Sequence, residues 1–540
     1  MSAVKFIFNM NKLKNLSSLN PRGRRFIHRS SATCTSTDSN NDKSPLAGIR
    51  VLDLTRIIAG PYCTMILGDL GAEILKIEKP GTGDECRNWG PPFLSGTKHA
   101  TYFLSVNRNK KSVCIDFKKG RDIIYELAKK SDVLIENFVP GKLSKMGLGY
   151  EDLKKAAPQL IYCSLTGYGY EGPYAQRPGY DVIAASVGGL MHITGPKDGD
   201  PCKVGIAITD VATGLYAHGA IMAALYQRTR NNQGQWIQCN LLSTQVACLI
   251  NVASNYLNAG KEATRWGSEH ESLVPYEAFP TSDGFMTVCT GSDAQFKALV
   301  DILELPELAN DERFINNTAR VINRVELLKI LRNKFKIKSN KEWAEILEGA
   351  PFPYGPINSI QEVFDDPHIK AIKMVKELEH DQMGKVKVVG PAVKFSYGEN
   401  QVRSPPPTLG QHTRQVLKQL LNYSDQTIDS LIKNKIDVPT ISLCLRKPRS
   451  NKKVQWTSST VDNENMNKKK SKCKFNYNDN YSLKKIAVVF MKNLSNLEKV
   501  AQTKVMMSAS IVMVVKKFIK KDYQVLPLHL MTIYLNQVIY

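Results

Sequence analysis

The stretch "GIRVLDLTRIIAGPYCTMILGDLGAEILKIEK", residues 48–79, holds two apolar runs separated by a segment rich in small residues. The runs "GIRVLDL" (48–54) and "EILKIEK" (73–79) have the length and apolar character of buried strands. The intervening "AGPYCTMILGDLGA" (59–72) predicts a turn followed by a short helix. A strand, a helix and a second strand in this succession predict two parallel strands joined by a helical crossover.

The same alternation of strand and helix continues to about residue 170. Further strands are predicted at "KSVCIDF" (111–117), "DVLIENF" (132–138) and "LIYCSLTGYG" (160–169), with helices at "GRDIIYELAKKS" (120–131) and "YEDLKKAAPQ" (150–159). The pattern indicates an α/β fold with a mostly parallel sheet and helices on both faces. Ligands of such sheets bind at the carboxyl ends of the strands. We therefore expect the site in the loops that follow Leu54, Glu78, Phe117, Phe138 and Thr166.

One acidic residue stands in the apolar stretch "VGIAITDVATGLYAHGAIMAAL" (204–225). A strand is predicted at residues 204–208 and a helix from about Val211, so Asp210 would lie at the turn between them. Asp is a preferred helix N-cap, because its oxygen accepts the free N–H groups of the first turn. Asp210 also fits a nucleophile held beside those N–H groups, since the small residues after it would let a ligand approach the backbone. Both interpretations stay open from these residues alone.

The formal net charge of +23 is concentrated at the two ends of the chain. Residues 1–44 hold eight Lys or Arg and two Asp or Glu, and residues 441–540 hold nineteen and five. The body between them is almost neutral, which disfavours a nucleic-acid-binding surface. The tail beyond residue 438 lacks helical or strand periodicity, and we expect it to be disordered.

The N-terminal segment has no acidic residue before Asp38 and contains seven Lys or Arg residues among several serines. This composition is typical of a mitochondrial transit peptide, with a basic tail as the alternative. We therefore expect a protein of the mitochondrial matrix. No stretch of the sequence reaches the roughly 18 apolar residues of a membrane span, so no membrane partner is expected.

Fingerprints of several common enzyme classes are missing from the sequence. The first strand-to-helix turn lacks GxGxxG, no GxxxxGK[ST] follows a strand, and no GxSxG occurs, which disfavours dinucleotide chemistry, nucleotide hydrolysis and serine hydrolysis. The eleven cysteines have no metal-ligand spacing and indicate reduced thiols. We expect no metal and no permanently bound cofactor.

Several segments, in order, resemble the family III CoA-transferases, which include formyl-CoA and carnitine CoA-transferases and the α-methylacyl-CoA racemases. These segments are residues 48–85, "SVNRNKKSVCIDFK" (105–118), "DVLIENFVPGKLSKMGLGYEDL" (132–153) and "IYCSLTGYGYEGPYAQRPGYD" (161–181). The resemblance spans about residues 46–437. Within the family, "DLTRIIAGP" (53–61) and "FPYGPIN" (352–358) look most like the succinyl-CoA:glutarate CoA-transferases.

The resemblance implies a Rossmann-like large domain, a smaller α/β domain and an interlocked homodimer. The chain would divide into 1–44 (transit peptide and linker), 45–225 (large CoA-binding domain), 226–264 (linker helices), 265–355 (small domain), 356–437 (return to the large domain) and 438–540 (basic tail).

The family nucleophile is an Asp at a strand-to-helix turn, and Asp210 in "AITDVATG" (207–214) matches it. The resemblance implies that this carboxylate takes CoA from a dicarboxylic acyl-CoA, with succinyl-CoA the expected donor. CoA would pass to a free dicarboxylate, glutarate or hydroxymethylglutarate, through mixed anhydrides and an aspartyl-CoA thioester. The helix N-terminus would keep Asp210 ionised.

The residues that match the family's CoA contacts follow the predicted strands. They are Lys79, Ile115, Phe117, Lys118, Asn137, Phe138, Lys145 and Met146, with Arg177 and Tyr180 in "RPGYD". A solvated surface charge is the alternative for each Lys, and a strand end beside a core aromatic is the alternative for Asn137 and Phe138. His270, in a loop that matches a mobile glycine loop of formyl-CoA transferase, is a candidate for binding the acceptor acid or a solvated loop residue.

Tyr180 decides between the two enzyme classes of this family. The racemases carry a catalytic His at its position, and a tyrosine with its usual pKa of about 10 is a poor base for α-proton exchange. The sequence therefore favours a transferase. A racemase and a non-catalytic CoA- or nucleic-acid-binding protein are the alternatives.

Overall fold

The computed structural model describes residues 43–433 of the chain. The expectations of a transit peptide and of a disordered tail concern residues that lie outside this range, apart from residues 43 and 44. The domain boundaries given above stay a prediction.

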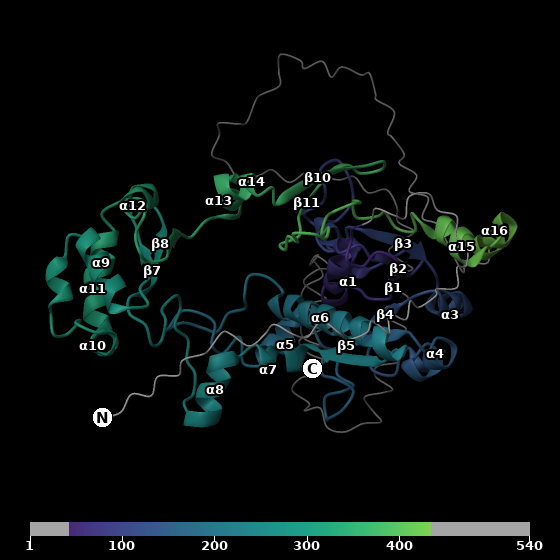
Figure 1. The fold of residues 1–540 in the computed structure, drawn as a ribbon, viewed down its shortest axis with the longest axis horizontal. Helices are drawn as coiled ribbons and strands as arrows, with labels where there is room; N and C mark the ends of the chain where they lie inside the picture. Colours follow the sequence, from purple (N-terminus) through teal and green to yellow (C-terminus); the bar gives the residue numbers. More distant parts are fainter. Residues whose placement is uncertain (1–42, 434–540) are drawn as a thin grey trace, which may run out of the picture. The chain divides into compact units, whose positions relative to one another are not determined.

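Six parallel strands form the central sheet of the described chain (Figure 1). They are β1 (Arg50–Asp53), β2 (Glu73–Glu78), β3 (Lys110–Cys114), β4 (Val133–Glu136), β5 (Ile161–Thr166) and β6 (Trp236–Asn240). Their order in the sheet is β3-β2-β1-β4-β5-β6, which is the order of doubly wound dinucleotide-binding folds. The predicted α/β fold with a Rossmann-like sheet is confirmed.

Helices cover both faces of this sheet because residues along each strand alternate between two apolar cores. Leu52 and Leu75 belong to the core of one face, and their neighbours Val51 and Ile74 belong to the core of the other. The first core is completed by α3 (Arg121–Lys129), α4 (Tyr150–Ala156), α15 (Thr413–Leu421) and α16 (Asp425–Lys433). The second is completed by α1 (Ala59–Asp69) and α6 (Ile208–Asn231).

The prediction of a strand at residues 204–208 is wrong. Ile208 already begins α6, and the sixth strand is β6, within a region predicted to be helical. β6 pairs with β5 from Tyr162–Trp236 to Thr166–Asn240, so it occupies the edge of the sheet that a strand at 204–208 would need. This pairing joins residues about 74 positions apart, which local periodicity does not report.

Four short helices lie between or beside these elements. They are α2 (Thr101–Leu104), α5 (Asp181–Val187), α7 (Leu241–Ala247) and α8 (Ile250–Ala259). Contacts of α5 with α6 and α7 bring the start of α5 close to the start of α6. No helix within residues 43–433 is long and apolar enough to cross a membrane.

A third apolar core is built around a three-stranded antiparallel sheet of β7 (Tyr276–Pro280), β8 (Phe285–Cys289) and β9 (Tyr354–Pro356). The surrounding helices are α9 (Asp293–Ile302), α10 (Asn317–Ile322), α11 (Arg324–Phe335) and α12 (Asn340–Ile346). Trp343 is fully buried there, and its indole N–H donates to the carbonyl of Phe335 at 2.7 Å. The small α/β unit expected from the resemblance has its own apolar core.

Residues 360–371 form two short helices rather than one continuous helix. These are α13 (Ile360–Asp365) and α14 (Pro367–Ala371), and Asp366 between them has an extended backbone. The ring of Pro367 disfavours a helical conformation at the residue before it. A hairpin of β10 (Val375–His380) and β11 (Gly384–Val389) follows.

Candidate active site

Two adjoining cavities open at the carboxyl ends of β1 and β4, where the strand order of the sheet reverses. The large cavity has a volume of about 680 Å³ and the small cavity about 200 Å³. Arg56, Phe138 and Lys142 line both of them. The two cavities therefore form one site with a shared wall.

The large cavity gathers residues from the loops after β1, β2, β3 and β4. Among the residues predicted from the sequence, it is lined by Lys79, Phe117, Lys118, Phe138 and Met146. Ile115 and Lys145 line neither cavity. The Ile115 side chain is fully buried in the core beneath the site, and Lys145 is exposed.

The small cavity contains Asp210 and the remaining predicted residues. Asn137, Phe138, Arg177 and Tyr180 line it together with Asp210. It also includes Thr166 and Gly167, so all five loops expected to form the site line one cavity or the other.

Two glycines set how closely the loop after β5 approaches the segment that carries Arg177 and Tyr180. A Cβ on Gly179 would lie 2.5 Å from the Cα of Gly167, and a Cβ on Gly167 would lie 2.7 Å from the Cα of Gly179. Backbone crosses backbone at this point, and no side-chain rotation can make room. The crossing fixes this wall of the small cavity.

Asp181, rather than Asp210, caps α6. Ala207 occupies the N-cap position of the helix and Asp210 lies in its first turn. One carboxylate oxygen of Asp181 accepts the backbone N–H groups of Thr209 at 2.7 Å and of Asp210 at 3.1 Å. No residue of the described chain donates a hydrogen bond to the Asp210 carboxylate, which is left free at the wall of the small cavity.

Burial of the Asp210 carboxyl group, reinforced by the nearby Asp181 carboxylate, raises its pKa to about 7. This opposes the expectation that the helix N-terminus keeps Asp210 ionised. At neutral pH a larger share of this carboxyl group is protonated than of an ordinary aspartic acid. Once deprotonated, a more basic carboxylate is also a stronger nucleophile.

A buried ion pair supports the loops around the large cavity. Lys76 and Asp84 are both fully buried, with Nζ and Oδ2 2.9 Å apart. Lys76 also donates to the carbonyl of Thr55 at 2.9 Å, and Asp84 accepts the backbone N–H of Ile57. The Lys76 ammonium lowers the pKa of Asp84 to about 2 against the opposing effect of burial. The pair ties the loop after β1 to the loop after β2.

The Asn137 side chain ties the loop after β4 to the loop after β1. Its Oδ1 accepts the backbone N–H of Arg56 at 3.0 Å, and its Nδ2 donates to the Arg56 carbonyl at 2.8 Å. Both ends of the amide are thus engaged by one neighbouring residue.

Sequence reasoning missed Arg56 and Lys142, although both line both cavities. The guanidinium of Arg56 lies 4.8 Å from the centre of the Phe138 ring, and the ammonium of Lys142 lies 4.9 Å from it. Their loops were expected to form the site, but neither basic side chain had a distinguishing spacing. A cation placed on an aromatic ring is visible only once the two loops are brought together.

His270 lines neither cavity. Its Nδ1 accepts the backbone N–H groups of Ser272 and Leu273 at 3.0 and 3.1 Å, so the ring organises its own loop. Within residues 43–433, no group of three or more His, Cys, Asp or Glu side chains is placed to hold a metal ion.

Comparisons with known proteins agree over the described part of the chain. The succinyl-CoA:glutarate CoA-transferases of Homo sapiens and Mus musculus are each 54% identical to it, over 73% and 72% of this chain and 90% and 89% of theirs. The crystal structure of a CAIB/BAIF family protein from Brucella suis, 40% identical, aligns with a TM-score of 0.64 over 70% of this chain and all of that one.

Two family models match different parts of the chain. A model described as protein phosphatase inhibitor matches residues 441–482, outside the described residues. The model of CoA-transferase family III matches residues 46–413. This match covers more than half of the chain and includes both cavities, and the chain therefore belongs to CoA-transferase family III.

Proposed function

We propose that this CoA-transferase moves CoA from succinyl-CoA to glutarate, with Asp210 as the covalent nucleophile. The observation that carries the proposal is the free carboxylate of Asp210 in a small cavity that adjoins a much larger one, whose lining includes Lys79 and Lys118. The names of the human and mouse relatives support the two substrates. Hydroxymethylglutarate is an alternative acceptor.

CoA would occupy the large cavity and the acyl group the small one. Lys79 and Lys118 offer positive charge for phosphate groups, and Phe117 and Phe138, whose ring centres are 5.5 Å apart, offer apolar surface. The thioester would then lie at the junction, where Phe138 belongs to both cavities. No resident cofactor takes part, since CoA arrives and leaves as a thioester.

The reaction would proceed through three covalent intermediates. A carboxylate oxygen of Asp210 attacks the succinyl carbonyl, the C–S bond breaks, and CoA leaves as a thiolate from a succinyl–aspartyl anhydride. The thiolate attacks the Asp210 carbonyl, which releases succinate and forms an aspartyl-CoA thioester. Glutarate attacks this thioester and gives a glutaryl–aspartyl anhydride and the thiolate. The thiolate then attacks the glutaryl carbonyl, forms glutaryl-CoA and frees Asp210.

Asp210→Asn tests the nucleophile. The amide is nearly isosteric, and Asp181 still caps α6 in the variant, so the fold is expected to stay intact. Formation of glutaryl-CoA should fall by about 10⁴-fold or more, while CoA binding is retained. With wild-type enzyme and succinyl-CoA, hydroxylamine should attack the carbonyl of the Asp210 thioester, displace CoA and leave a hydroxamate on the peptide that holds Asp210.

The exposed Asp122 of α3 provides a matched control. Asp122→Asn should keep wild-type turnover. Normal turnover by Asp210→Asn, or a hydroxylamine adduct on Asp181 in place of Asp210, would show that the assignment is wrong.

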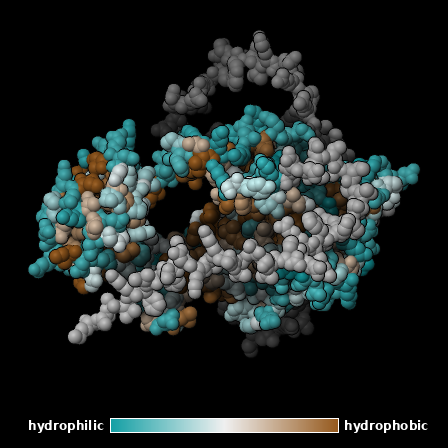
Figure 2. Space-filling view, viewed as in Figure 1, coloured by the Kyte–Doolittle hydropathy of each residue, from teal (hydrophilic) through white to brown (hydrophobic). Residues whose placement is uncertain are grey.

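We propose that the working enzyme is a homodimer. Helices α6 and α8 carry large apolar side chains that are strongly exposed in the single chain, among them Tyr226 (65%), Ile250 (72%) and Leu257 (78%). Figure 2 shows apolar side chains (brown) gathered near the centre of one face. Monomeric proteins rarely leave large apolar patches in water, and a second copy of the chain would cover these side chains.

We propose that the mature enzyme works in the mitochondrial matrix after its N-terminal segment is removed. The support is the acid-free, basic composition of the first 37 residues. Sequencing the N-terminus of protein purified from mitochondria tests this. A start beyond about residue 30 supports it, and a cytosolic protein with Met1 or Ser2 intact contradicts it.

We propose a separate activity for the C-terminal segment, namely binding and inhibition of a protein phosphatase. The match of residues 441–482 to a phosphatase-inhibitor family supports this, as does the absence of overlap with the transferase match at 46–413. Truncation after residue 440 should abolish phosphatase inhibition and leave CoA transfer unchanged. A large loss of transferase rate, or unchanged inhibition, would contradict the division.

A further inference from the structure

One buried donor at the junction of the two cavities has no partner. Within residues 43–433, four buried side-chain polar atoms lack a hydrogen-bond partner, and Nε of Arg56 is one of them. Arg56 lines both the large and the small cavity. Buried polar groups in proteins are nearly always satisfied, so an unpaired N–H on a residue that lines both cavities points to an acceptor on a ligand.

The backbone of Arg56 is held on both sides. Asn137 bonds its N–H and its carbonyl group. The next residue, Ile57, has φ of +71°, which is a strained conformation for a β-branched side chain. Asp84 accepts the N–H of Ile57 at 3.1 Å and maintains the strain, and Lys76 neutralises Asp84. Backbone strain that the surroundings maintain is concentrated at ligand-binding sites.

The guanidinium of Arg56 is only partly engaged by protein groups. One terminal nitrogen forms an ion pair with Glu85, and the guanidinium carbon Cζ lies over the Phe138 ring. The ring restricts the side chain to the junction, and the Glu85 contact leaves Nε free. A planar guanidinium with a free N–H is suited to bind an anionic oxygen.

We propose that Arg56 binds the distal carboxylate of the dicarboxylic substrate and so selects dicarboxylates over monocarboxylates. The inference rests on the proposed transfer between succinyl-CoA and glutarate. Arg56 shares the small cavity with Asp210, which is where the acyl group would react. A phosphate of CoA is the other source of an anionic oxygen near Arg56, because the residue also lines the large cavity.

The test compares Arg56→Lys with wild type. The variant keeps the positive charge and can still pair with Glu85, but it loses Nε–H and the planar group. The KM for glutarate should rise about tenfold or more, and the preference for glutarate over valerate, a monocarboxylate of equal length, should fall by the same factor. The dissociation constant of free CoA should stay within about twofold of wild type.

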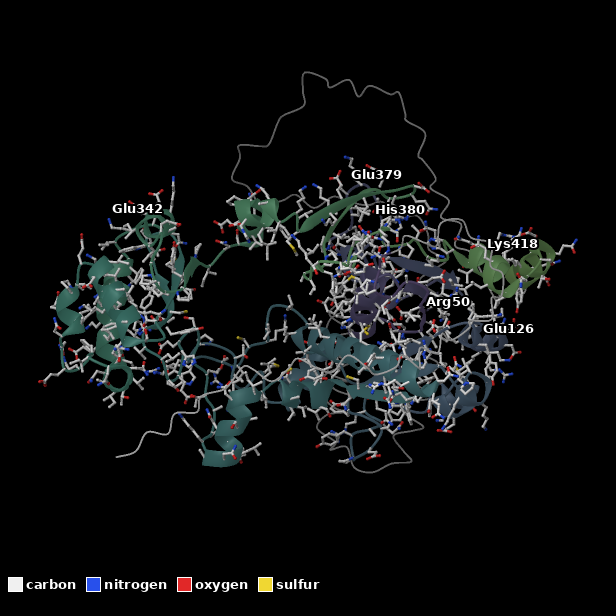
Figure 3. All side chains as sticks on the ribbon, viewed as in Figure 1. Arg50, Glu126, Glu342, Glu379, His380 and Lys418 are labelled. Carbon is white, nitrogen blue, oxygen red and sulfur yellow. The ribbon has the colours of Figure 1, made fainter. Side chains whose placement is uncertain are left out.

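Arg50→Lys is the matched control. Arg50 begins β1 (labelled in Figure 3), at the opposite end of the strand from the cavities, and pairs with Glu73. Its kinetic constants should equal those of wild type. Glu85→Gln provides a second variant that retains Arg56. Because it removes the competing carboxylate, it should lower the KM for glutarate.

Three results would overturn the proposal. A weaker affinity for CoA with an unchanged KM for glutarate would assign Arg56 to a CoA phosphate. An Arg56→Lys variant with the KM for glutarate and the CoA affinity of wild type would show that Arg56 binds neither ligand. An unfolded Arg56→Lys combined with an unchanged KM in Glu85→Gln would show that Arg56 has a structural role.

Asp210→Asn, assayed in parallel, separates these results from failure of the proposed reaction. If wild type makes glutaryl-CoA and Asp210→Asn is inactive, the proposed reaction is upheld whatever the result for Arg56.

Discussion

Asp181, rather than Asp210, takes the role of the helix cap in the structure. The sequence left two roles open for Asp210, helix cap and nucleophile. Asp181 accepts the N–H groups at the start of α6, so the Asp210 carboxylate is not drawn into capping its own helix. The negative charge of Asp181 also disfavours a second negative charge beside it. Asp181 thus both leaves the carboxylate of the proposed nucleophile free and raises its pKa.

Asp181→Asn should lower the pKa of Asp210 without removing the cap. The amide oxygen can still accept both N–H groups, while the neighbouring charge that raises the pKa of Asp210 is lost. Wild-type kcat/KM should rise with pH through about 7, as Asp210 ionises. In Asp181→Asn the same rise in kcat/KM should occur at lower pH. The pH profile of glutaryl-CoA formation measures it.

A second aspartate caps a helix in the same manner away from the site. Asp366 accepts the N–H groups of His368 and Ile369 at the start of α14. Asp366→Asn therefore reports the effect of changing a capping carboxylate to an amide, and its pH profile should match wild type. An unshifted profile in Asp181→Asn would show that Asp181 does not tune Asp210.

Ionisation of the Asp210 carboxyl group should also lower the free energy of unfolding at neutral and alkaline pH. Its pKa is raised from 3.8 to about 7 on folding, so the folded state binds more protons than the unfolded state between these values. Stability contributed by this group is present below about pH 4 and is lost as pH rises through about 7. Asp210→Asn should therefore be more stable than wild type at pH 8 by about 4 kcal/mol, and by less at pH 5. Thermal or urea unfolding at the two pH values measures this, and equal stabilities at pH 8 would contradict it.

At the scale of elements, the first five strands and the loops of the site were predictable, because each strand is a local apolar run followed by turn residues. The features that the sequence did not predict depend on contacts between segments that are distant in the chain. The run at 204–208 is apolar enough for a strand, but the edge of β5 is taken by β6. The cap of α6 comes from a residue 29 positions before Asp210, and the placement of Arg56 depends on Asn137, 81 positions away. Periodicity describes none of these pairs.

The crossing of Gly167 and Gly179 gives a prediction for the loop elements of the small cavity. Gly179→Ala places a Cβ 2.5 Å from the Cα of Gly167, so the two backbones must separate. We expect a loss of stability of about 1–3 kcal/mol and a fall in kcat/KM of about tenfold or more, because Arg177 and Tyr180 move with the segment.

Gly205→Ala is the control for this change. A Cβ at Gly205 would have no atom within 4 Å, so the same substitution should leave stability and kcat/KM near wild-type values. Equal behaviour of the two variants would show that the crossing does not position the cavity wall.

At the scale of the whole molecule, the exposed apolar residues of α6 predict that the chain associates with itself. Leu215 and Tyr216 lie on this helix with about half of their surface exposed (48% and 53%), and Asp210 lies in its first turn. An interface there would bury the helix that carries the proposed nucleophile, so association and activity should be coupled. Light scattering of wild type should give the mass of a dimer.

Leu215→Glu should shift the protein towards monomer and lower its specific activity in parallel, since a buried unpaired charge opposes association. Ile322→Glu, at an apolar and more exposed position (75%) on α10, should remain dimeric and active. A monomeric wild type with full activity would contradict the coupling, because it would mean that one chain alone completes the site.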